Sequence, residues 1–368
     1  MNFFNSVILN KNNLINNINV IKNEAKNKKV CAMVKANAYN HNLKFTVLTL
    51  KNYVDFFGVA NSEEALKVRT YAYKNKILIC GTFNKEKLKE LISNNISLTI
   101  FSIKNLTDIL KVCKKNNLKA KVHIKLNTGM NRLGIKSKSY LLKVLEFINI
   151  HKNYLILEGV FSHLFNSVNA SLCKMQYFKF IDYLNVIRRF TIRNELQYSK
   201  LIVHLENSGG LFNHIDYLNI CSMVRVGISL YGLENYSELL KPVLSLNSKI
   251  IAIQKVSYED FVGYGKTLVD HSGQVAVVPI GYADGILKSY KDCYVYILNK
   301  KCKILNVCMD MILVDISKIK AKIGDDVEII SNNKLRKNSA DNLAKMQNTI
   351  SYEIVTNLNY NRLNLIEK

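Results

Sequence analysis

Over about the first 230 residues, short runs of apolar residues alternate with longer amphipathic stretches. The amphipathic stretches show helical spacing, as at Leu14, Ile18, Ile21 and Ala25. Asn61 followed by Glu64 is typical of a capped helix start. The apolar runs predict eight strands, at Val30–Val34, Phe56–Ala60, Ile77–Cys80, Leu98–Phe101, Val122–Leu126, Leu155–Phe161, Leu201–His204 and Met223–Val226.

Eight strands that alternate with helices predict a (β/α)8 barrel of the TIM type. An open doubly wound sheet is the alternative, but the chain has no glycine-rich dinucleotide fingerprint to favour it.

After Leu233 the pattern becomes β-rich, with turn residues between short apolar segments. These segments are "VLSLNSKIIAIQKV", "QVAVVPIGY", "CYVYIL", "KILNVCMDMILVDI" and "DDVEII", and a helical segment follows near Ala340–Gln347. We therefore predict an α/β protein with a barrel domain over residues 1–234 and a mostly-β domain over residues 235–368.

Charge changes this picture little, although 52 Lys and Arg against 28 Asp and Glu give a net charge of +24. Such a charge could indicate a nucleic acid or an anionic membrane as partner. The lysines are scattered among asparagines, as in "KNLTDILKVCKKNNLKAK", which is typical of solvated helix faces. We therefore predict neither partner, while the basic surface would still attract small anions.

The cysteine pattern and the start of the chain predict a cytoplasmic protein without a metal site. Eight cysteines form no C-x-x-C pair, which is typical of reduced thiols rather than of disulfides or zinc ligands. The start, "MNFFNSVILNKNN", lacks the basic region and the long apolar stretch of a signal peptide. No stretch is long enough to cross a membrane.

Polar residues follow five of the predicted strands. They are Lys35 in "VCAMVKANAYNHN", Lys125 and Arg132 in "KLNTGMNR", His163, Asn207 and Ser208 in "ENSGG", and Arg225 and Gly227 in "RVGI". In a barrel the carboxyl ends of the strands share one rim, where the chemistry takes place. The seventh and eighth loops offer a hydroxyl group and backbone N–H groups that suit a phosphate. A lysine beside a phosphate site indicates pyridoxal 5'-phosphate, whose aldehyde forms an imine with a lysine amine.

Nine motifs in order resemble those of alanine racemases. They are "VKANAYNH", "KLNTGMNRLGI", "FSHL", "HLENSGG", "MVRVGISLYGL", "VGYGKT", "PIGYADG", "VCMDM" and "TISYE", and they span roughly residues 30 to 355. The resemblance implies a pyridoxal-phosphate-dependent isomerase that interconverts L-alanine and D-alanine and supplies D-alanine for peptidoglycan. It also implies a head-to-tail homodimer with shared active sites.

The same resemblance assigns roles to single residues. Lys35 would carry the cofactor and act as one base, and the partner subunit's Tyr264 would be the other. Tyr39, Asn207, Ser208, Gly227, Ile228 and Tyr352 would hold the phosphate. Arg225 would bond the pyridine nitrogen and contact His163. Arg132 and the backbone N–H of the partner subunit's Met309 would bind the substrate carboxylate, and a carbamylated Lys125 would orient Arg132.

Racemisation removes a proton from one face of the α-carbon and returns one to the other, which two opposed bases accomplish directly. Lysine and tyrosine have high reference pKa values, and a neighbouring cation lowers both. An arginine keeps its proton, so a pyridine nitrogen beside Arg225 would stay unprotonated. The cofactor ring would then be a weaker electron sink, which discourages transamination.

The chain departs from the family pattern at several positions. Asn40 and Asn131 replace glycines, and Asn is the residue that best tolerates the positive φ expected there. Asn127 replaces an aspartate, and Leu305 and Asn306 replace a Gly-Arg pair. Glu206 replaces an alanine, and its carboxylate would be unfavourable near a phosphate unless it points away.

These departures leave substrate preference open between alanine, serine and a broader set of amino acids. A related decarboxylase fits the motifs less well. A non-catalytic pyridoxal-phosphate carrier would not need the second domain with "VGYG" and "VCMD".

Overall fold

The computed structural model describes residues 4–194, 198–213, 219–265 and 267–368. The chain forms two compact units. We call the described residues of Ile18–Ala38 and Asn42–Leu230 the barrel unit. We call those of Met1–Asn17, Tyr39–His41 and Tyr231–Lys368 the β-rich unit.

Eight parallel strands form the barrel, in the order β8-β7-β6-β5-β4-β3-β2-β9. They are β2 (Lys29–Met33), β3 (Phe56–Val59), β4 (Lys76–Ile79), β5 (Ile96–Ile100), β6 (Ala120–Lys125), β7 (Leu155–Phe161), β8 (Ile202–His204) and β9 (Met223–Val226). All eight predicted strands are thus confirmed, with ends shifted by at most two residues.

The first strand of the barrel pairs with the last, as Cys31 lies opposite Arg225 in the parallel ladder of β2 and β9. Between β8 and β9, single hydrogen bonds take the place of a ladder. The Ser222 N–H donates to the Val203 carbonyl at 2.9 Å, and the Arg225 N–H to the Glu206 carbonyl at 3.1 Å. The sheet is therefore a nearly closed barrel, and the alternative of an open doubly wound sheet is wrong.

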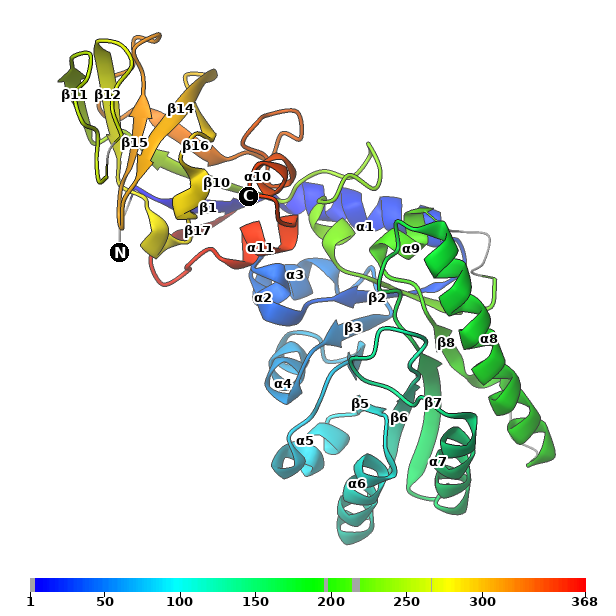
Figure 1. Cartoon of the computed structure of the whole chain (residues 1–368). Coiled ribbons are helices and arrows are strands. Elements are labelled where there is room, and N and C mark those ends of the chain that lie inside the picture. Colours follow the sequence, from blue (N-terminus) through cyan, green and yellow to red (C-terminus); the bar gives the residue numbers. More distant parts are fainter. Residues whose placement is uncertain (1–3, 195–197, 214–218, 266) are drawn as a thin grey trace. The chain divides into compact units, whose positions relative to one another are not determined.

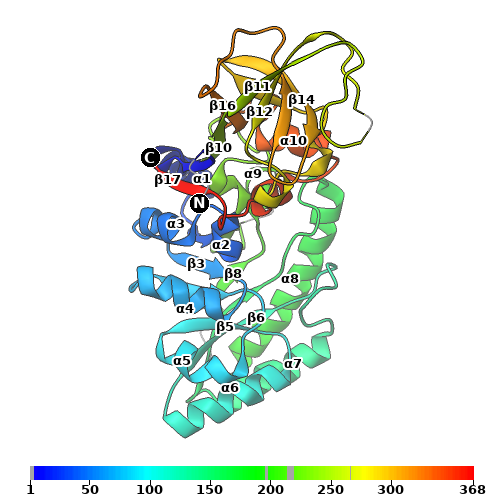
Figure 2. The ribbon, with the colours of Figure 1, turned by 90° about the vertical axis from the view of Figure 1, so that its left-hand side faces the viewer.

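Helices lie outside the barrel strands in both views (Figures 1 and 2). They include α3 (Leu43–Leu50), α4 (Ser62–Tyr71), α5 (Leu88–Ser93), α6 (Ile103–Asn116), α7 (Lys138–Ile150), α8 (Ala170–Arg193) and α9 (Ser208–Asn213), while α1 (Lys11–Ala25) and α2 (Lys35–Tyr39) have residues in both units. In α6, for example, Leu106, Ile109 and Cys113 repeat at helical spacing and are buried. The predicted start of α4 is confirmed, because the Asn61 side chain accepts the Glu64 N–H at 2.9 Å.

The β-rich unit contains a nine-stranded sheet in the order β11-β12-β15-β14-β13-β16-β10-β1-β17. Its strands are β1 (Ser6–Leu9), β10 (Leu244–Lys249), β11 (Ala252–Val256), β12 (Gly273–Val278), β13 (Tyr294–Ile297), β14 (Lys300–Val307), β15 (Ile312–Asp315), β16 (Asp326–Ile330) and β17 (Asn364–Glu367). Two helices accompany it, α10 (Ala340–Met346) and α11 (Ser351–Thr356). The β-rich character and α10 confirm the sequence prediction, whereas β1, β17 and α11 were not predicted.

All eight cysteines are free thiols. Within the described ranges, the helices are too short or too polar to cross a bilayer.

Candidate active site

Lys35 lies directly after β2, at the start of a left-handed turn. Ala36, Asn37 and Ala38 have φ values of 51°, 52° and 58°, and Tyr39 and Asn40 continue the turn at 53° and 63°. For residues other than glycine this conformation costs about 1–2 kcal/mol each. The positive φ expected at Asn40 is confirmed, whereas Ala36, Ala38 and Tyr39 give no such signal in the sequence. Strain of this kind persists only where surrounding contacts impose it, and it concentrates at functional sites.

The carboxylate of Glu64, on α4, holds the start of this turn. One oxygen accepts the Ala36 N–H at 2.7 Å, and the other accepts the Ala60 N–H at 2.8 Å. The Ala38 N–H donates to the Val34 carbonyl at 2.9 Å, and the Asn37 side chain accepts the Leu43 N–H at 2.9 Å. The backbone on both sides of Lys35 is thus fixed by contacts within the barrel unit.

Arg225, on β9, is buried at the rim, and its guanidinium group is held from several sides. Nη1 donates to His204 Nδ1 at 2.7 Å and to the His204 carbonyl at 3.1 Å. Nη2 donates to the carbonyl groups of Ser162 at 2.6 Å and Leu205 at 3.2 Å, and it lies 3.4 Å from His163 Nδ1. The centre of the Phe161 ring lies 5.1 Å from Arg225 Cζ, with Cζ over the ring face.

The loop that carries His163 is anchored by Gln176 of α8, a residue that was not predicted. The amide of Gln176 donates to the His163 carbonyl and to the Thr128 hydroxyl, both at 2.9 Å. The Thr128 and Ser162 hydroxyl groups are 2.8 Å apart, so the loops after β6 and β7 are joined. Burial, together with Arg225 and other nearby cations, lowers the pKa of His163 well below its usual range. This imidazole is therefore neutral at neutral pH.

Lys125 ends β6 and is almost fully buried. Its amine donates to the Cys80 carbonyl at 3.4 Å and lies 5.5 Å from the Phe161 ring centre. Burial and the nearby Arg132, Arg225 and Lys35 lower the pKa of Lys125 to about 8, although Cys80 opposes this shift. A substantial fraction of this amine is therefore uncharged at mildly alkaline pH.

The turn between Lys125 and Arg132 is organised by Asn127. Its side-chain oxygen accepts the N–H groups of Gly129 at 3.0 Å and Asn131 at 3.2 Å. Asn131 has a φ of 56°, as expected from the residue type, and Arg132 is exposed beside it. The asparagine at position 127 thus fulfils the structural role that an aspartate could have in this turn.

The residues predicted to hold a phosphate fall into two groups. In the barrel unit, the Ser208 hydroxyl accepts the Gly227 N–H at 3.1 Å, Ile228 follows directly, and Asn207 accepts the Gly210 N–H at 2.9 Å. In the β-rich unit, the rings of Tyr39 and Tyr352 are 5.7 Å apart between centroids.

Glu206 does not point into the Ser208 loop. Its carboxylate is buried and pairs with Lys28 at 3.1 Å. Lys28 precedes β2, at the other end of that strand from Lys35. Burial raises the pKa of Glu206, and Lys28 opposes this shift. The expected conflict with a bound phosphate is therefore avoided by orientation.

Tyr264 belongs to the β-rich unit and lies in an exposed turn, with 77% of its surface accessible. Gly263 and Gly265 flank it with φ values of 70° and 84°. The buried amide of Asn306 holds this turn by donating to the carbonyl groups of Val262 at 2.9 Å and Tyr264 at 2.8 Å. Met309 is also exposed, and its carbonyl accepts the Ala283 N–H at 2.8 Å.

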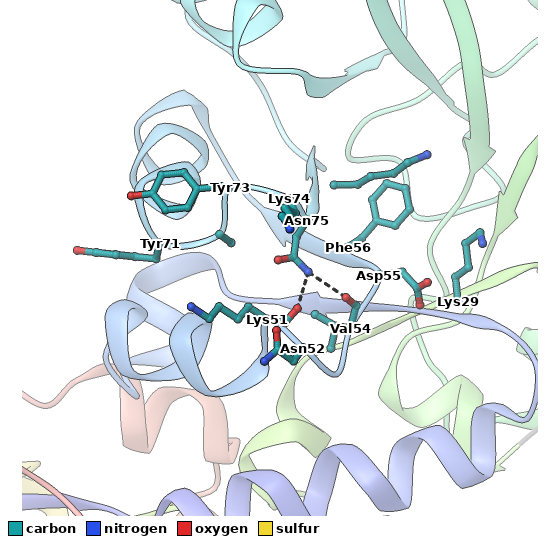
Figure 3. A pocket seen from close by; sticks show the side chains of 12 residues that line it. Lys29, Lys51, Asn52, Val54, Asp55, Phe56, Tyr71, Tyr73, Lys74 and Asn75 are labelled. Atoms are coloured by element: carbon teal, nitrogen blue, oxygen red, sulfur yellow. Dashed lines mark hydrogen bonds between the residues drawn. The ribbon is translucent and has the colours of Figure 1, made fainter.

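A cavity of about 640 Å³ lies at the opposite end of the barrel, where β2, β3 and β4 begin (Figure 3). Asn75 lines this cavity, and its side-chain amide donates to the carbonyl groups of Lys51 at 2.8 Å and Val54 at 3.0 Å. None of the predicted site residues lines this cavity. Because TIM-type barrels perform their chemistry at the carboxyl ends of the strands, the rim at Lys35 is the candidate active site.

The barrel unit therefore brings Arg225 and His163 together, and it places Lys35, Lys125 and the Ser208 loop at the carboxyl ends of β2, β6 and β8. Tyr39, Tyr264, Met309 and Tyr352 belong to the β-rich unit. Sequence reasoning missed Glu64 as a support of the Lys35 turn, Gln176, and His204. In the sequence, Glu64 is recognisable only as part of a helix start, and His204 is an ordinary residue of an apolar strand.

A nearly closed parallel barrel with a basic rim, followed by a separate β-sheet unit, defines a two-domain barrel enzyme. Two family models match the chain: the alanine racemase N-terminal domain over residues 9–235 and the alanine racemase C-terminal domain over residues 243–365. The chain belongs to the alanine racemase family and is an isomerase.

Individual relatives agree with this assignment. An alanine racemase of Borreliella burgdorferi is 36% identical over 366 residues, which cover 96% of this chain and 94% of the relative. One from Francisella philomiragia is 34% identical over 368 residues, covering 95% and 96%. The solved structure of an alanine racemase from Clostridium difficile 630 superposes with a TM-score of 0.88 at 28% identity, covering 100% of this chain and 97% of that one.

Proposed function

We propose that this protein interconverts L-alanine and D-alanine with pyridoxal 5'-phosphate as cofactor, and so supplies D-alanine for peptidoglycan in the cytoplasm. The observation that carries this proposal, beside the family membership, is the position of Lys35. A half-buried amine stands on a strained turn at the rim where Arg225 and the Ser208 loop also lie.

The residues at this rim fit the proposed cofactor. Arg225 uses Nη1 and Nη2 on protein acceptors, whereas its Nε–H makes no hydrogen bond to any of the described residues. That N–H is an available donor on a buried side chain, and it is suited to an unprotonated pyridine nitrogen. The hydroxyl of Ser208, the amide of Asn207 and the backbone at Gly227 and Ile228 suit a phosphate, with the Tyr39 and Tyr352 hydroxyl groups as further donors.

Lys35 would hold the cofactor through its aldehyde carbon. When bound, pyridoxal phosphate supplies an electron-withdrawing ring that acidifies the α-proton of an attached amino acid. The protein's own residues then perform the proton transfers. Lys35 takes or returns the proton on one face of the α-carbon, and the partner subunit's Tyr264 serves the other face.

Arg132 would bind the substrate carboxylate with a charge-assisted hydrogen bond, and the backbone N–H of the partner subunit's Met309 would add a second donor. Lys125, whose lowered pKa leaves part of the amine neutral, is suited to carbamylation. The resulting negative charge would orient Arg132. A neutral His163 would place no second positive charge beside Arg225.

A homodimer with shared sites follows from the proposed role of Tyr264. The barrel domain over residues 1–234 would supply Lys35, and the β domain over residues 235–368 would supply Tyr264 and Met309 to the partner subunit's site. In the single chain Tyr264 and Met309 are 77% and 58% exposed, which suits residues that complete a site on another subunit.

The proposal is tested by incubating the purified protein with L-alanine in deuterated water. We expect D-alanine to form and deuterium to appear at the α-carbon of both enantiomers. The K35A and Y264F variants should lose most of this activity. Cofactor binding without deuterium uptake would contradict the proposal and favour a carrier, and faster turnover of L-serine than of L-alanine would assign a serine or broad-specificity racemase.

A further inference from the structure

A continuous chain of hydrogen bonds crosses the interior of the barrel, starting at Arg225. His204 Nδ1 lies 2.7 Å from Arg225 Nη1, and His204 Nε2 lies 2.9 Å from His123 Nδ1. His123 Nε2 lies 3.1 Å from Glu158 Oε2. These residues come from β9, β8, β6 and β7, so the chain links side chains of four strands.

Glu158 ends the chain as a carboxylate. Lys76 Nζ donates to its Oε1 at 2.8 Å, and the Ser97 hydroxyl donates to its Oε2. Burial alone would raise the pKa of this carboxyl group. The hydrogen bonds from His123, Lys76 and Ser97 outweigh burial and hold the pKa well below its usual range.

Arg225 at one end and Glu158 at the other determine which nitrogen of each histidine carries the proton. An arginine can only donate, so His204 Nδ1 must accept and the His204 proton must lie on Nε2. His123 Nδ1 must accept that proton in turn, and the His123 proton then lies on Nε2 and points to a carboxylate that can only accept. Burial lowers the pKa of both imidazoles, which agrees with two neutral rings.

Neighbouring residues inside the barrel pack closely against the two histidines. A Cβ atom at Gly159 would lie 2.4 Å from His123 Nδ1, so only glycine leaves room for that ring. The Phe161 ring stacks on His204 with centroids 4.7 Å apart and planes 6° apart. Among the described residues no carboxylate forms an ion pair with Arg225. The hydrogen bonds through His204 and His123 instead connect Arg225 to the negative charge of Glu158.

We propose that His204, His123 and Glu158 are positioning residues for Arg225, forming an oriented chain that fixes the direction of its guanidinium group and offsets its buried charge. A buried charge without compensation is costly, and hydrogen bonds within a chain polarise and strengthen one another. The catalytic consequence rests on the proposed function, whereas the proton arrangement does not depend on it.

The proton arrangement is tested by NMR of the full-length protein labelled with 15N in histidine and arginine, both with its cofactor and after cofactor removal. We expect His123 and His204 to be neutral with their protons on Nε2 in both forms. We also expect hindered rotation of the Arg225 guanidinium group. A charged ring, or a proton on Nδ1 of either histidine, would overturn the proposal.

Variants of Glu158 test the positioning role. E158L removes both acceptors, whereas E158Q keeps one acceptor oxygen for His123 and loses the charge and the second acceptor. In E158L we expect His123 to populate both tautomers and Arg225 to rotate more freely, although Glu158 touches neither Arg225 nor the proposed substrate site. In E158Q the tautomers should persist.

Activity of the cofactor-loaded protein gives a separate readout. Loss of about 1.4 kcal/mol of transition-state stabilisation corresponds to a tenfold lower kcat, and we expect a fall of about that size in E158L. The fall should be smaller in E158Q, and KM should change little in either variant.

The matched control is T99V. Thr99 is buried on β5 opposite His123 in the ladder, and its hydroxyl has no hydrogen-bond partner among the described residues. T99V should leave the NMR signals and kcat unchanged. Equal effects in T99V and E158L, or unchanged Arg225 signals in a folded E158L, would overturn the positioning role even if racemisation itself is confirmed.

Discussion

At the scale of single residues, the site depends on side chains that fix the backbone by hydrogen bonds. Asn306 stands where the family pattern has an arginine, and it fixes the turn at Tyr264 through the carbonyl groups on both sides of Gly263. A Cβ atom at Gly263 would lie 2.8 Å from Asn306 Cγ, so the glycine and the asparagine fit each other. Although Asn306 departs from the family pattern, it therefore supports the turn that carries Tyr264, the proposed second base.

Replacing Asn306 with alanine should loosen this turn. The buried carbonyl of Val262 and the partly buried carbonyl of Tyr264 would lose their donor, so we expect stability to fall by about 1–3 kcal/mol. We also expect kcat to fall by about tenfold, because a misplaced base costs rate steeply. Denaturant unfolding and steady-state kinetics measure both effects. N332A, an exposed asparagine of the same unit, is the control, and equal behaviour of the two variants would contradict this role for Asn306.

Lys125 should make stability depend on pH. Its pKa is about 8 in the folded chain and about 10.4 when unfolded, so the unfolded chain binds the extra proton between these values. The free energy of unfolding should therefore rise with pH across this window, relative to K125M. Below about pH 8 both states are protonated, and the difference should be constant.

The measurement is urea unfolding of both proteins from pH 7 to pH 10, in buffer free of carbon dioxide so that the amine stays unmodified. K143M, at an exposed position on α7, serves as the control. A constant difference between the native protein and K125M across the whole range would show that the pKa of Lys125 is not lowered.

Residue type alone predicted some of these features and not others. The positive φ at Asn40 and Asn131 follows from the tolerance of asparagine for that conformation. The orientation of Glu206 could not be predicted, because it depends on Lys28, 178 positions away in the sequence. The importance of His204 was also hidden, since a histidine in an apolar strand gives no sign of the partners that other strands supply.

At the scale of elements, the unusual feature is the left-handed turn that follows β2. Alanines at positions 36 and 38 do not favour this conformation, so contacts from elsewhere must impose it. Glu64 supplies one such contact from the first turn of α4. The strand pattern predicted the barrel because its period is local, whereas this turn is determined by a partner on another element.

Replacing Glu64 with glutamine should weaken the turn, because a side-chain amide has one acceptor oxygen for two N–H groups. We expect a loss of about 1–3 kcal/mol in stability, and faster hydrogen exchange at Ala36 or Ala60. Racemisation should fall as Lys35 loses its fixed direction.

E63Q is the matched control, since Glu63 lies in the same helical turn and, among the described residues, forms an ion pair only with the half-exposed Lys87, at 3.5 Å. If E64Q and E63Q exchanged hydrogen at the same rates at both Ala36 and Ala60, the proposed support by Glu64 would be wrong.

At the scale of the whole molecule, the proposed site requires two chains. The lysine variant K35A and the tyrosine variant Y264F should each be inactive as homodimers. A mixed dimer would contain one site with both native residues, so mixing the two proteins after dissociation should restore about a quarter of native activity.

Activity of such a mixture, measured against time and protein concentration, tests subunit sharing directly. K35A mixed with itself under the same conditions is the control. If the mixture stayed inactive although mixed dimers were present, each site would be built from a single chain, and the proposed domain roles would be wrong.

The β-rich unit joins the two ends of the chain within one sheet, because Ser6–Leu9 pairs in parallel with Asn364–Glu367 and antiparallel with Leu244–Lys249. During synthesis Ser6–Leu9 must therefore wait for segments that are made much later. The barrel can form on the ribosome as its strands emerge in order, but this sheet cannot. A nascent chain thus carries an unpaired strand edge until Asn364–Glu367 has emerged, and this interval favours misassembly between neighbouring chains.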